Sequence, residues 1–389
     1  MFQKLRALSR HYSEYRRFRS GNTRPRIVFY AEDQESWPYY EPIVAALTGP
    51  QGRKITYVTS SPTDPILTRN DPRIEAFCVG PGMMCITFFQ TLDNALLVMT
   101  MPDLQTFHIK RSTSPAVHYL YIFHSMVSTH MTYRTGAFDH FDSVLCVGPH
   151  HVAEIRATEK IYGLKPKELF EHGYARLDAI LADQQNRPPA ARSGPPRVLL
   201  APSWGEHAIL ETIGEPVIEA LLQAGFHLTV RPHPRTRHLH PQLMARLVAT
   251  FGQRPNFVFE GNISSRQSLL DSDVMISDWS GAALDYAFGL EKPVIFLDVP
   301  RKVNNPEYER LPMPPLEVSI REQLGAVLRP DDLGGLAGKV EEIIREAPAY
   351  RERLREIRAR NIFNVGGSGL AGAQRIAEEF DRKFPRRIG

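Results

Sequence analysis

Short apolar runs alternate with segments of helical periodicity along most of the chain. In the first half, runs rich in β-branched and aromatic residues occupy positions 26–30, 54–59, 74–79, 94–100 and 116–123. Strands that are separated by helices are typical of a parallel sheet with helices on both faces. The pattern therefore predicts an α/β domain in the first half of the chain.

The second half of the chain repeats this alternation. Strand-like apolar runs lie at residues 226–230 and 292–298, and the segments 347–361 and 370–384 have the pattern of helices. Between the two blocks, residues 184–197 are rich in proline and small polar residues, which indicates a domain boundary. We therefore expect two α/β domains joined by this linker.

The first 25 residues form a separate, basic segment. Apolar residues recur there at close to helical spacing, at Phe2, Leu5, Leu8, Tyr12, Tyr15 and Phe18. Basic residues lie between them, so residues 1–25 are expected to form a basic amphipathic helix. Such a helix can lie on an anionic membrane surface or dock on its own protein, and the sequence leaves both alternatives open.

Composition places the chain among folded proteins. Of its 389 residues, 42% are hydrophobic and 23% are charged, which excludes an intrinsically disordered chain. No apolar run approaches the roughly 20 residues that span a bilayer, and the N-terminus lacks the apolar core of a signal peptide. The three cysteines have no metal-binding spacing, so a reduced, cytosolic compartment is expected.

The net charge of +4 is concentrated toward both ends of the chain. Nucleic acid, an anionic membrane surface or an anionic substrate would each suit such ends. Solvated helix faces explain the same charges equally well.

Two histidines follow apolar strands. His124 comes directly after the run 116–123 and is followed by a small residue, the place where open α/β sheets present catalytic side chains. His233 lies between Pro232 and Pro234, which hold it in a stiff, extended turn. Such a histidine suits an acid, a base or a donor to phosphate. A buried structural histidine is the alternative reading of His233.

A polar turn precedes a helix predicted to start near Ala282. It contains Ser277, Asp278, Ser280 and Gly281, of which Ser280 or Asp278 is expected to cap the helix. The free N–H groups of a helix N-terminus also bind anions, and a glycine lets a phosphate approach the backbone. The turn therefore predicts a phosphate site as well as a cap.

Patterns for metals and common cofactors are weak. The chain has no Gly-rich dinucleotide fingerprint, no Walker loop, no His-Glu-x-x-His sequence and no paired cysteines. The pairs His150-His151 and His238-x-His240 are more typical of exposed loops than of a metal site. We expect no metal.

Three motifs together resemble a known family. They are Arg-Pro-His-Pro at 231–234, Ser-Asp-x-x-x-Ser-Asp-Trp-Ser-Gly-x-x-x-Asp-Tyr at 272–286, and Lys-Pro-Val-Ile-Phe at 292–296. This combination is similar to the CDP-glycerol glycerophosphotransferases, which include wall teichoic acid primases and polymerases and capsule-making relatives. Residues 201–204 and 173–178 add supporting matches, and the resemblance covers roughly residues 118–375.

The resemblance implies a GT-B architecture, in which two Rossmann-like α/β domains face each other across a cleft and the C-terminal one holds most of the nucleotide. It implies a transferase that moves glycerol phosphate, or a related polyol phosphate, from a CDP-alcohol to a hydroxyl of a cell-surface glycan or lipid-linked acceptor, releasing CMP. No cofactor beyond this nucleotide substrate and no nucleic-acid partner are expected. The expected location is cytoplasmic, with the inner face of the cell membrane as the contact of the basic helix.

The family carries two important histidines, matched here by His124 and His233. Phosphoryl transfer needs an aligned acceptor hydroxyl and stabilised charge on the phosphates. We therefore expect His124 to be the general base, and His233 with Arg231 to stabilise the diphosphate or protonate the leaving group. The other predicted nucleotide-binding residues are Ser277, Asp278, Ser280, Gly281 and Asp285. The serines and the glycine are expected to hold phosphate. The aspartates are expected to orient His233 or to cap a helix. His124 is followed by serine where the family has glycine, so the backbone beside it departs from the family pattern.

The motifs and the linker together predict four parts of the chain: a basic helix over 1–25, an acceptor domain over 26–185, a nucleotide-binding domain over 186–345, and helices over 346–389 that pack back toward the N-terminal domain. One alternative function is a GT-B sugar-nucleotide glycosyltransferase or a UDP-sugar 2-epimerase. A second alternative is a non-enzymatic protein that binds membranes or polyanions through its basic ends. A preference for cytidine over uridine nucleotides separates the first alternative from the main prediction.

Overall fold

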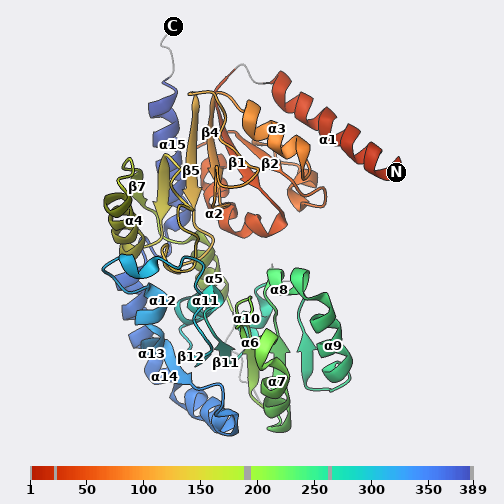
Figure 1. Cartoon of the computed structure of the whole chain (residues 1–389), viewed down its shortest axis with the longest axis vertical. Helices are drawn as coiled ribbons and strands as arrows, with labels where there is room; N and C mark the ends of the chain where they lie inside the picture. Colours follow the sequence, from red (N-terminus) through yellow and green to blue (C-terminus); the bar gives the residue numbers. More distant parts are fainter. Residues whose placement is uncertain (1, 22–23, 188–193, 262–264, 386–389) are drawn as a thin grey trace. The chain divides into compact units, whose positions relative to one another are not determined.

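Two parallel β-sheets, each covered by helices, make up the computed structural model (Figure 1). The structure describes residues 2–21, 24–187, 194–261 and 265–385. The chain divides into two compact units that are not contiguous in sequence. Unit 1 comprises Met1–His124, Tyr133–Asp178 and Ile362–Gly389, and unit 2 comprises Ser125–Thr132 and Ala179–Asn361.

The sheet of unit 1 has seven parallel strands in the order β3-β2-β1-β4-β5-β6-β7. Their bounds are β1 Arg26–Ala31, β2 Ile55–Thr59, β3 Ile74–Cys78, β4 Ala95–Met99, β5 Val117–Ile122, β6 Ser143–Cys146 and β7 Glu168–Glu171. Every residue of β2, β4, β5 and β6 is buried. Strands covered on both faces read as largely apolar runs, which is why the sequence pattern located β2, β4 and β5.

The helices of unit 1 include one from the far end of the sequence. They are α1 Phe2–Ser20, α2 Trp37–Thr48, α3 Met83–Thr91, α4 Pro149–Tyr162 and α15 Ser368–Lys383, with short 3-10 turns η1 Gln34–Ser36 and η2 Pro65–Thr68. Helix α5 (Ala175–Gln185) starts in unit 1 and ends in unit 2. Helix α15 packs along α2 and contributes Ala373 and Ile376 to the core of unit 1.

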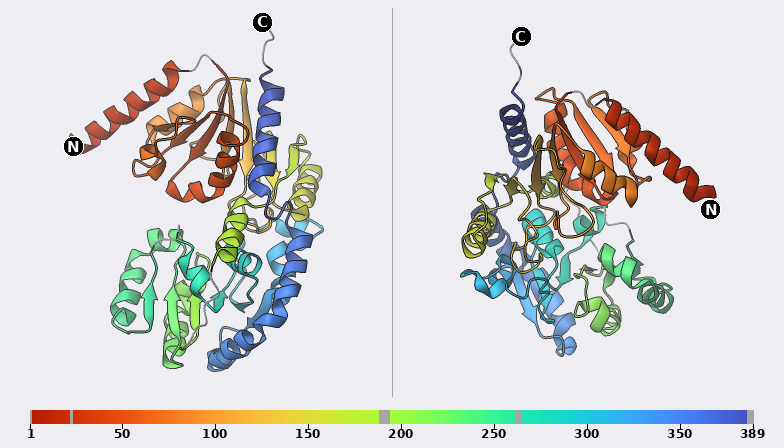
Figure 2. Two further views of the ribbon diagram at one scale, coloured as in Figure 1. Left: turned by 180° about the vertical axis from the view of Figure 1, so that it is seen from behind. Right: turned by 45° about the horizontal axis from the view of Figure 1, so that its top comes forward.

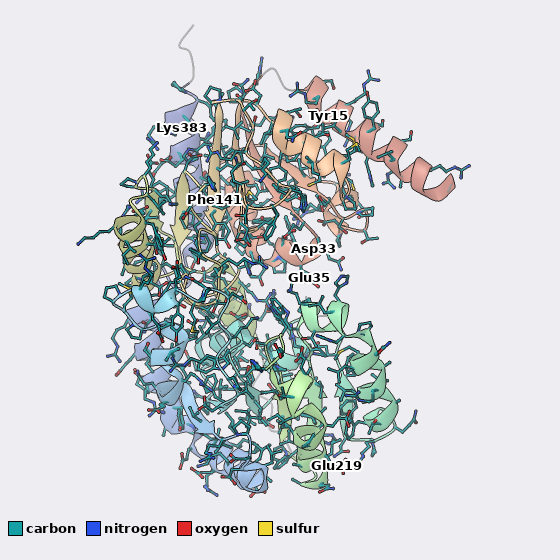
Figure 3. All side chains as sticks on the ribbon, viewed as in Figure 1. Tyr15, Asp33, Glu35, Phe141, Glu219 and Lys383 are labelled. Carbon is teal, nitrogen blue, oxygen red and sulfur yellow. The ribbon has the colours of Figure 1, made fainter. Side chains whose placement is uncertain are left out.

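Helix α1 docks on unit 1 through its second half. Phe18 is fully buried against Phe77 and Phe88. The hydroxyl of Tyr15, which is labelled in Figure 3, lies 2.8 Å from Thr91 Oγ1. In the first half, Leu8 is about half exposed, and the first turns extend past the rest of unit 1 (Figure 2). Docking on its own protein is therefore realised for the second half of α1. No described helix combines the length and apolar character needed to cross a membrane.

The sheet of unit 2 has six parallel strands in the order β10-β9-β8-β11-β12-β13. Their bounds are β8 Arg197–Leu200, β9 His227–Val230, β10 Phe257–Phe259, β11 Val274–Ser277, β12 Val294–Leu297 and β13 Gly325–Leu328. The strand order reverses between β8 and β11. In open α/β sheets, ligands bind at the carboxyl ends of the strands beside such a switch point.

The helices of unit 2 are mostly short and connect successive strands. They are α6 Ile209–Thr212, α7 Gly214–Gln223, α8 Pro234–Leu239, α9 Pro241–Phe251, α10 Gln267–Asp271, α11 Gly281–Leu290, α12 Leu316–Ser319, α13 Arg321–Leu324 and α14 Leu336–Asn361, with 3-10 turns η3 Tyr308–Arg310 and η4 Leu333–Gly335. Of the predicted C-terminal helices, α14 belongs to unit 2 and α15 to unit 1.

The division between the units lies close to the predicted linker. Unit 2 resumes at Ala179, somewhat before the predicted linker at 184–197. Asp183, at the end of α5, forms an ion pair with Arg266, and both residues belong to unit 2. Part of the linker, residues 188–193, lies outside the described residues, as do the last basic residues of the chain.

The segment Ser125–Thr132 leaves unit 1 and becomes part of unit 2. Glu317, which is buried, accepts hydrogen bonds from Ser128 N (2.8 Å), Ser128 Oγ (2.9 Å) and Thr132 Oγ1 (2.9 Å). The side chain of Asn305 donates to the carbonyl of His130 at 2.9 Å. We refer to residues 125–132 as the crossing segment, since it passes into unit 2 directly after His124.

Candidate functional site

His124 follows β5 of unit 1, and its ring is held by a backbone carbonyl. Its Nδ1 lies 3.2 Å from the Thr100 carbonyl oxygen and 3.4 Å from the Tyr121 hydroxyl. A carbonyl oxygen only accepts hydrogen bonds, so Nδ1 carries the proton of the neutral ring. Nε2 is then left with its lone pair. In this tautomer the imidazole is prepared to accept a proton at Nε2.

Tyrosines surround His124 within unit 1. The rings of Tyr39 and Tyr133 meet the imidazole edge to face, with centroids 6.2 Å and 5.8 Å away. The hydroxyl of Tyr174 donates to the backbone carbonyl of His124 at 2.9 Å. Tyr174 belongs to the 173–178 motif, and these contacts show what that motif does: it fixes the strand end that presents His124.

The same motif also binds the segment that leads into α15. Asp178 accepts hydrogen bonds from the backbone N–H of Gly366 (2.7 Å) and of Ser368 (2.6 Å). Ser368 Oγ in turn accepts a hydrogen bond from the backbone N–H of Tyr174 at 3.0 Å. The match at residues 173–178 and the segment 366–368 are therefore parts of one structural unit around His124.

His233 of unit 2 has the opposite proton arrangement. It is the N-cap of α8, and its Nδ1 accepts a hydrogen bond from the backbone N–H of Arg235 at 3.1 Å. Because Nδ1 is an acceptor, the proton of the neutral ring lies on Nε2. His233 therefore presents an N–H donor where His124 presents a lone pair. The two prolines predicted this stiff turn but could not predict the tautomer.

Arg231 is buried and already paired within unit 2. Its Nη1 donates to Ser268 Oγ at 3.0 Å and lies 3.6 Å from the Glu260 carboxylate. These contacts join the end of β9 to the start of α10 and compensate the guanidinium charge. The predicted role of Arg231 as a phosphate ligand stays a prediction.

The polar turn after β11 is built largely from structural hydrogen bonds. Ser277 is fully buried, and its hydroxyl donates to the Ala201 carbonyl at 2.7 Å. Asp278 accepts from the backbone N–H of Ser203 (2.6 Å) and of Ile209 (3.1 Å), and its burial raises the pKa of the carboxyl. Asp278 thus holds the loop after β8 rather than contacting His233. Both side chains keep the strand ends of β8 and β11 together.

Ser280 caps α11 as predicted, because its Oγ accepts the Ala282 N–H at 3.3 Å. Gly281 is needed for a close approach within unit 2. A Cβ atom at this position would lie 2.3 Å from Ser125 Oγ of the crossing segment. The group beside Gly281 in the structure is therefore a serine hydroxyl, and the phosphate-binding role of this turn stays a prediction. Asp285 is buried in the second turn of α11.

The sheet order brings most of these positions to one edge of unit 2. Arg231 and His233 follow β9, and Ser277 to Gly281 follow β11, while β8 lies between these two strands. The loop after β8 carries Trp204, whose ring centroid is 6.1 Å from that of His233. The sequence motif included Trp204 without giving it a role. Lys302, which contacts Trp204 from the loop after β12, carries no sequence signal because it lies outside the three motifs.

The described residues contain no group of three or more histidine, cysteine or acidic side chains arranged to hold a metal ion. The site of unit 2 instead offers an imidazole N–H, a capped helix N-terminus and nearby cationic side chains. The site of unit 1 offers an imidazole lone pair. These are groups that phosphoryl transfer to a hydroxyl can employ.

Two Rossmann-like units with parallel sheets define the GT-B class that the sequence predicted. A profile of the family described as CDP-glycerol:poly(glycerophosphate) glycerophosphotransferase matches residues 88–309. That match covers more than half of the chain, and the chain therefore belongs to this family. It is an enzyme of the CDP-glycerol glycerophosphotransferase type, and the non-enzymatic alternative is set aside. No curated protein matches the chain in sequence.

Several solved structures share the fold. A variant of the wall teichoic acid polymerase TagF, soaked with CDPG, is 15% identical, with a TM-score of 0.60 and coverage of 98% of this chain and 96% of that chain. The UDP-GlcNAc 2-epimerase of Methanocaldococcus jannaschii, in complex with UDP-GlcNAc and UDP, is 14% identical, with a TM-score of 0.54 and coverage of 91% and 99%. A glycosyltransferase from Rickettsia africae ESF-5 is 13% identical, with a TM-score of 0.52 and coverage of 93% and 99%. At these identities the likeness concerns the fold alone.

Proposed function

We propose that the enzyme transfers glycerol phosphate, or a related polyol phosphate, from a CDP-alcohol to an acceptor hydroxyl and releases CMP. The observation that carries the proposal is the pair of opposite histidine tautomers. His124 is set to take a proton at Nε2, and His233 is set to donate from Nε2. A hydroxyl nucleophile and an anionic leaving group require these two complementary functions.

In the proposed reaction, the acceptor hydroxyl loses its proton to Nε2 of His124 as its oxygen bonds to the phosphorus of the transferred group. The bond between that phosphorus and the bridging diphosphate oxygen breaks, and the electron pair leaves with CMP. The N–H of His233 stabilises the negative charge that develops on the diphosphate. Ser280 and the N-terminus of α11 add positive potential from the same sheet edge. The proposal includes no metal and no organic cofactor.

The acceptor proposed is a hydroxyl of a cell-surface glycan or lipid-linked acceptor, including a growing polyol phosphate chain of teichoic acid or capsule type. The family description supports it, because it names poly(glycerophosphate) beside CDP-glycerol.

The direct test is incubation of the purified enzyme with CDP-glycerol, CDP-ribitol or UDP-GlcNAc, with and without a lipid-linked polyol phosphate acceptor. We expect acceptor-dependent release of CMP from a CDP-alcohol. His124→Ala and His233→Ala should each reduce turnover by roughly 10²- to 10⁴-fold, the usual contribution of general acid–base groups. His227→Ala, an exposed position at the start of β9, is the matched control. Conversion of UDP-GlcNAc without any CMP release would instead establish the epimerase or glycosyltransferase alternative.

We further propose that the first half of α1 attaches the enzyme to the inner face of the cell membrane. Leu8 is 48% and Tyr12 53% exposed, and Arg6 and Arg10 flank them. An apolar strip between basic residues suits the surface of an anionic bilayer. Sedimentation with phosphatidylglycerol vesicles should fall sharply in a Leu8→Ser, Tyr12→Ser double variant and should be weak with phosphatidylcholine alone. Equal sedimentation of the double variant would refute membrane attachment through α1.

A further inference from the structure

Several side chains of unit 2 converge on one indole ring. The ammonium of Lys302 lies 4.0 Å from the centroid of Trp204, and the guanidinium carbon of Arg235 lies 4.3 Å from it. The ring of His233 is the third neighbour, at 6.1 Å. We call these four residues the Trp204 cluster. They come from the loops after β8 and β12 and from the start of α8, which follows β9, and only the fold brings these segments together.

The positive charge of this cluster is incompletely compensated. The acidic residues that act on Lys302 are Asp278 and Glu211. Asp278 already accepts two backbone N–H bonds, and one oxygen of Glu211 accepts from Thr236 Oγ1 at 2.7 Å. Within the described residues, no ion pair neutralises Lys302. An ammonium group that keeps its donors unused beside a second cation is suited to an anionic ligand.

The protonation of Lys302 is sensitive to what lies beside it. Its burial and the nearby charge of Arg235 lower its pKa to about 7, against the opposing charge of Asp278. An arriving dianion would favour the charged ammonium and raise that pKa again. Ligand binding near neutral pH is then coupled to proton uptake by the protein. A surface lysine with an ordinary pKa would show no such coupling.

The place of the cluster fits a nucleotide. Trp204 follows β8 and Asp278 follows β11, the two strands between which the order of the sheet reverses. Ligands of open α/β sheets bind at this point. A flat indole fixed under two cations also orients them, since each cation is attracted to the face of the ring.

We propose that Lys302, held over Trp204 beside Arg235 and His233, binds the diphosphate of the nucleotide donor. The inference rests on the proposed function, and it adds a binding residue that lies outside the sequence motifs. Lys302 contacts the diphosphate directly, whereas Trp204 is a positioning residue that keeps the ammonium in place.

Calorimetric titration of the full chain with CDP, inorganic pyrophosphate and cytidine tests this proposal. Lys302→Met should weaken binding of CDP and of pyrophosphate by roughly 10- to 100-fold, the range for loss of a hydrogen bond to a charged group. Cytidine, which has no phosphate, should bind as before. Lys302→Arg should retain part of the affinity, and Arg301→Met, at the exposed neighbouring position, should bind like the unchanged enzyme.

Proton uptake provides a second measurement. Titrations of CDP near pH 7.5 in buffers of different ionisation enthalpy should show protons taken up by the unchanged enzyme and by Arg301→Met, but fewer by Lys302→Met. Thermal unfolding shows whether each variant is folded. If Lys302→Met does not fold, the same titrations are made with Lys302→Arg.

The outcomes separate this inference from the proposed function. Unchanged pyrophosphate affinity and proton uptake in a folded Lys302→Met variant would overturn the role of Lys302, even if the enzyme releases CMP from CDP-glycerol. Loss of pyrophosphate binding in that variant would support the diphosphate site, even if no CDP-alcohol were a substrate.

Discussion

At the scale of single residues, proton placement decides what each histidine can do. His124 and His233 have the same side chain, and both follow a strand. One Nδ1 faces a carbonyl oxygen and the other faces a backbone N–H. These single contacts assign a lone pair to Nε2 of His124 and a proton to Nε2 of His233. The tautomers of the two rings thus depend on two backbone groups, Thr100 C=O and Arg235 N–H.

Gly281 and Ser125 form a testable steric pair. Gly281→Ala would place a methyl group within 2.3 Å of Ser125 Oγ, so we expect a loss of roughly 1–3 kcal/mol in the free energy of unfolding. Adding Ser125→Gly should restore most of that loss. Urea denaturation of the two single variants and the double variant measures the coupling between the positions.

Gly338→Ala is the matched control for this pair. Gly338 lies within α14 and has open space around it, so the substitution should stabilise by up to about 1 kcal/mol. A Gly281→Ala variant as stable as the unchanged protein would show that the crossing segment does not depend on this glycine.

The residue-level predictions from sequence succeeded where the cause is local. Ser280 is a cap because serine before a helix accepts its first N–H groups, and the prolines fix the turn of His233. The neighbour of Gly281 is a residue more than a hundred positions away, and no local pattern announces it. Lys302 was missed for the same reason, since its position over Trp204 is created by the arrangement of three loops.

At the scale of elements, α15 completes unit 1. Its Gly372 lies against the ring of His172, where a Cβ would come within 2.8 Å of Nε2. His172 is almost fully buried beside α15. Burial therefore lowers the pKa of His172 to about 4. Helix α15 therefore packs against His172, whose imidazole is neutral near pH 7 because of its lowered pKa.

This burial predicts a pH dependence of stability. An unfolded histidine titrates near 6.5, so between about pH 6.5 and pH 4 the unfolded chain binds a proton that the folded chain does not. Stability is therefore lost as the pH falls through that window, by about 2 kcal/mol at pH 5 from this residue. Urea denaturation at pH 7.5 and pH 5 measures the loss.

A His172→Leu variant should show a smaller loss of stability on acidification. His118, whose pKa is also lowered to about 4 mainly by burial, should keep part of the dependence. Equal pH dependence in the variant and the unchanged protein would mean that His172 is not the titrating group.

Element positions followed from the alternation of apolar runs, because buried parallel strands are mostly apolar. The sequence pattern did not show which elements pack against each other. The periodicity of residues 370–384 does not indicate that α15 packs on α2. An amphipathic pattern shows which face of a helix is buried, but it does not show which other element covers that face.

At the scale of the whole molecule, the chain passes between the units several times. One of these passages occurs between His124 and Ser125. The crossing segment is held in unit 2 by Glu317, while His124 belongs to unit 1. The peptide bond between His124 and Ser125 thus joins the predicted general base directly to unit 2, which carries the predicted nucleotide-binding residues.

Glu317→Ala tests whether this link positions His124. The variant leaves the N–H and hydroxyl of Ser128 without their acceptor, which should cost roughly 1–3 kcal/mol of stability. We expect kcat to fall by up to about a hundredfold, as for a shift of roughly 1 Å at a reacting group, with unchanged affinity for CDP. Glu322→Ala, an exposed neighbour in α13, is the control. A normal kcat in the destabilised variant would show that the segment serves stability alone.

The placement of α15 also has a consequence for synthesis on the ribosome. The strands of unit 1 are made first, but the helix that covers α2 is made after every residue of unit 2. Unit 2 has all its parts once Asn361 has emerged, so it is able to fold while the first-made sheet still lacks part of its cover. Translation order and folding order are therefore expected to be reversed, and a chain interrupted after residue 361 would leave the earliest strands as its least stable part.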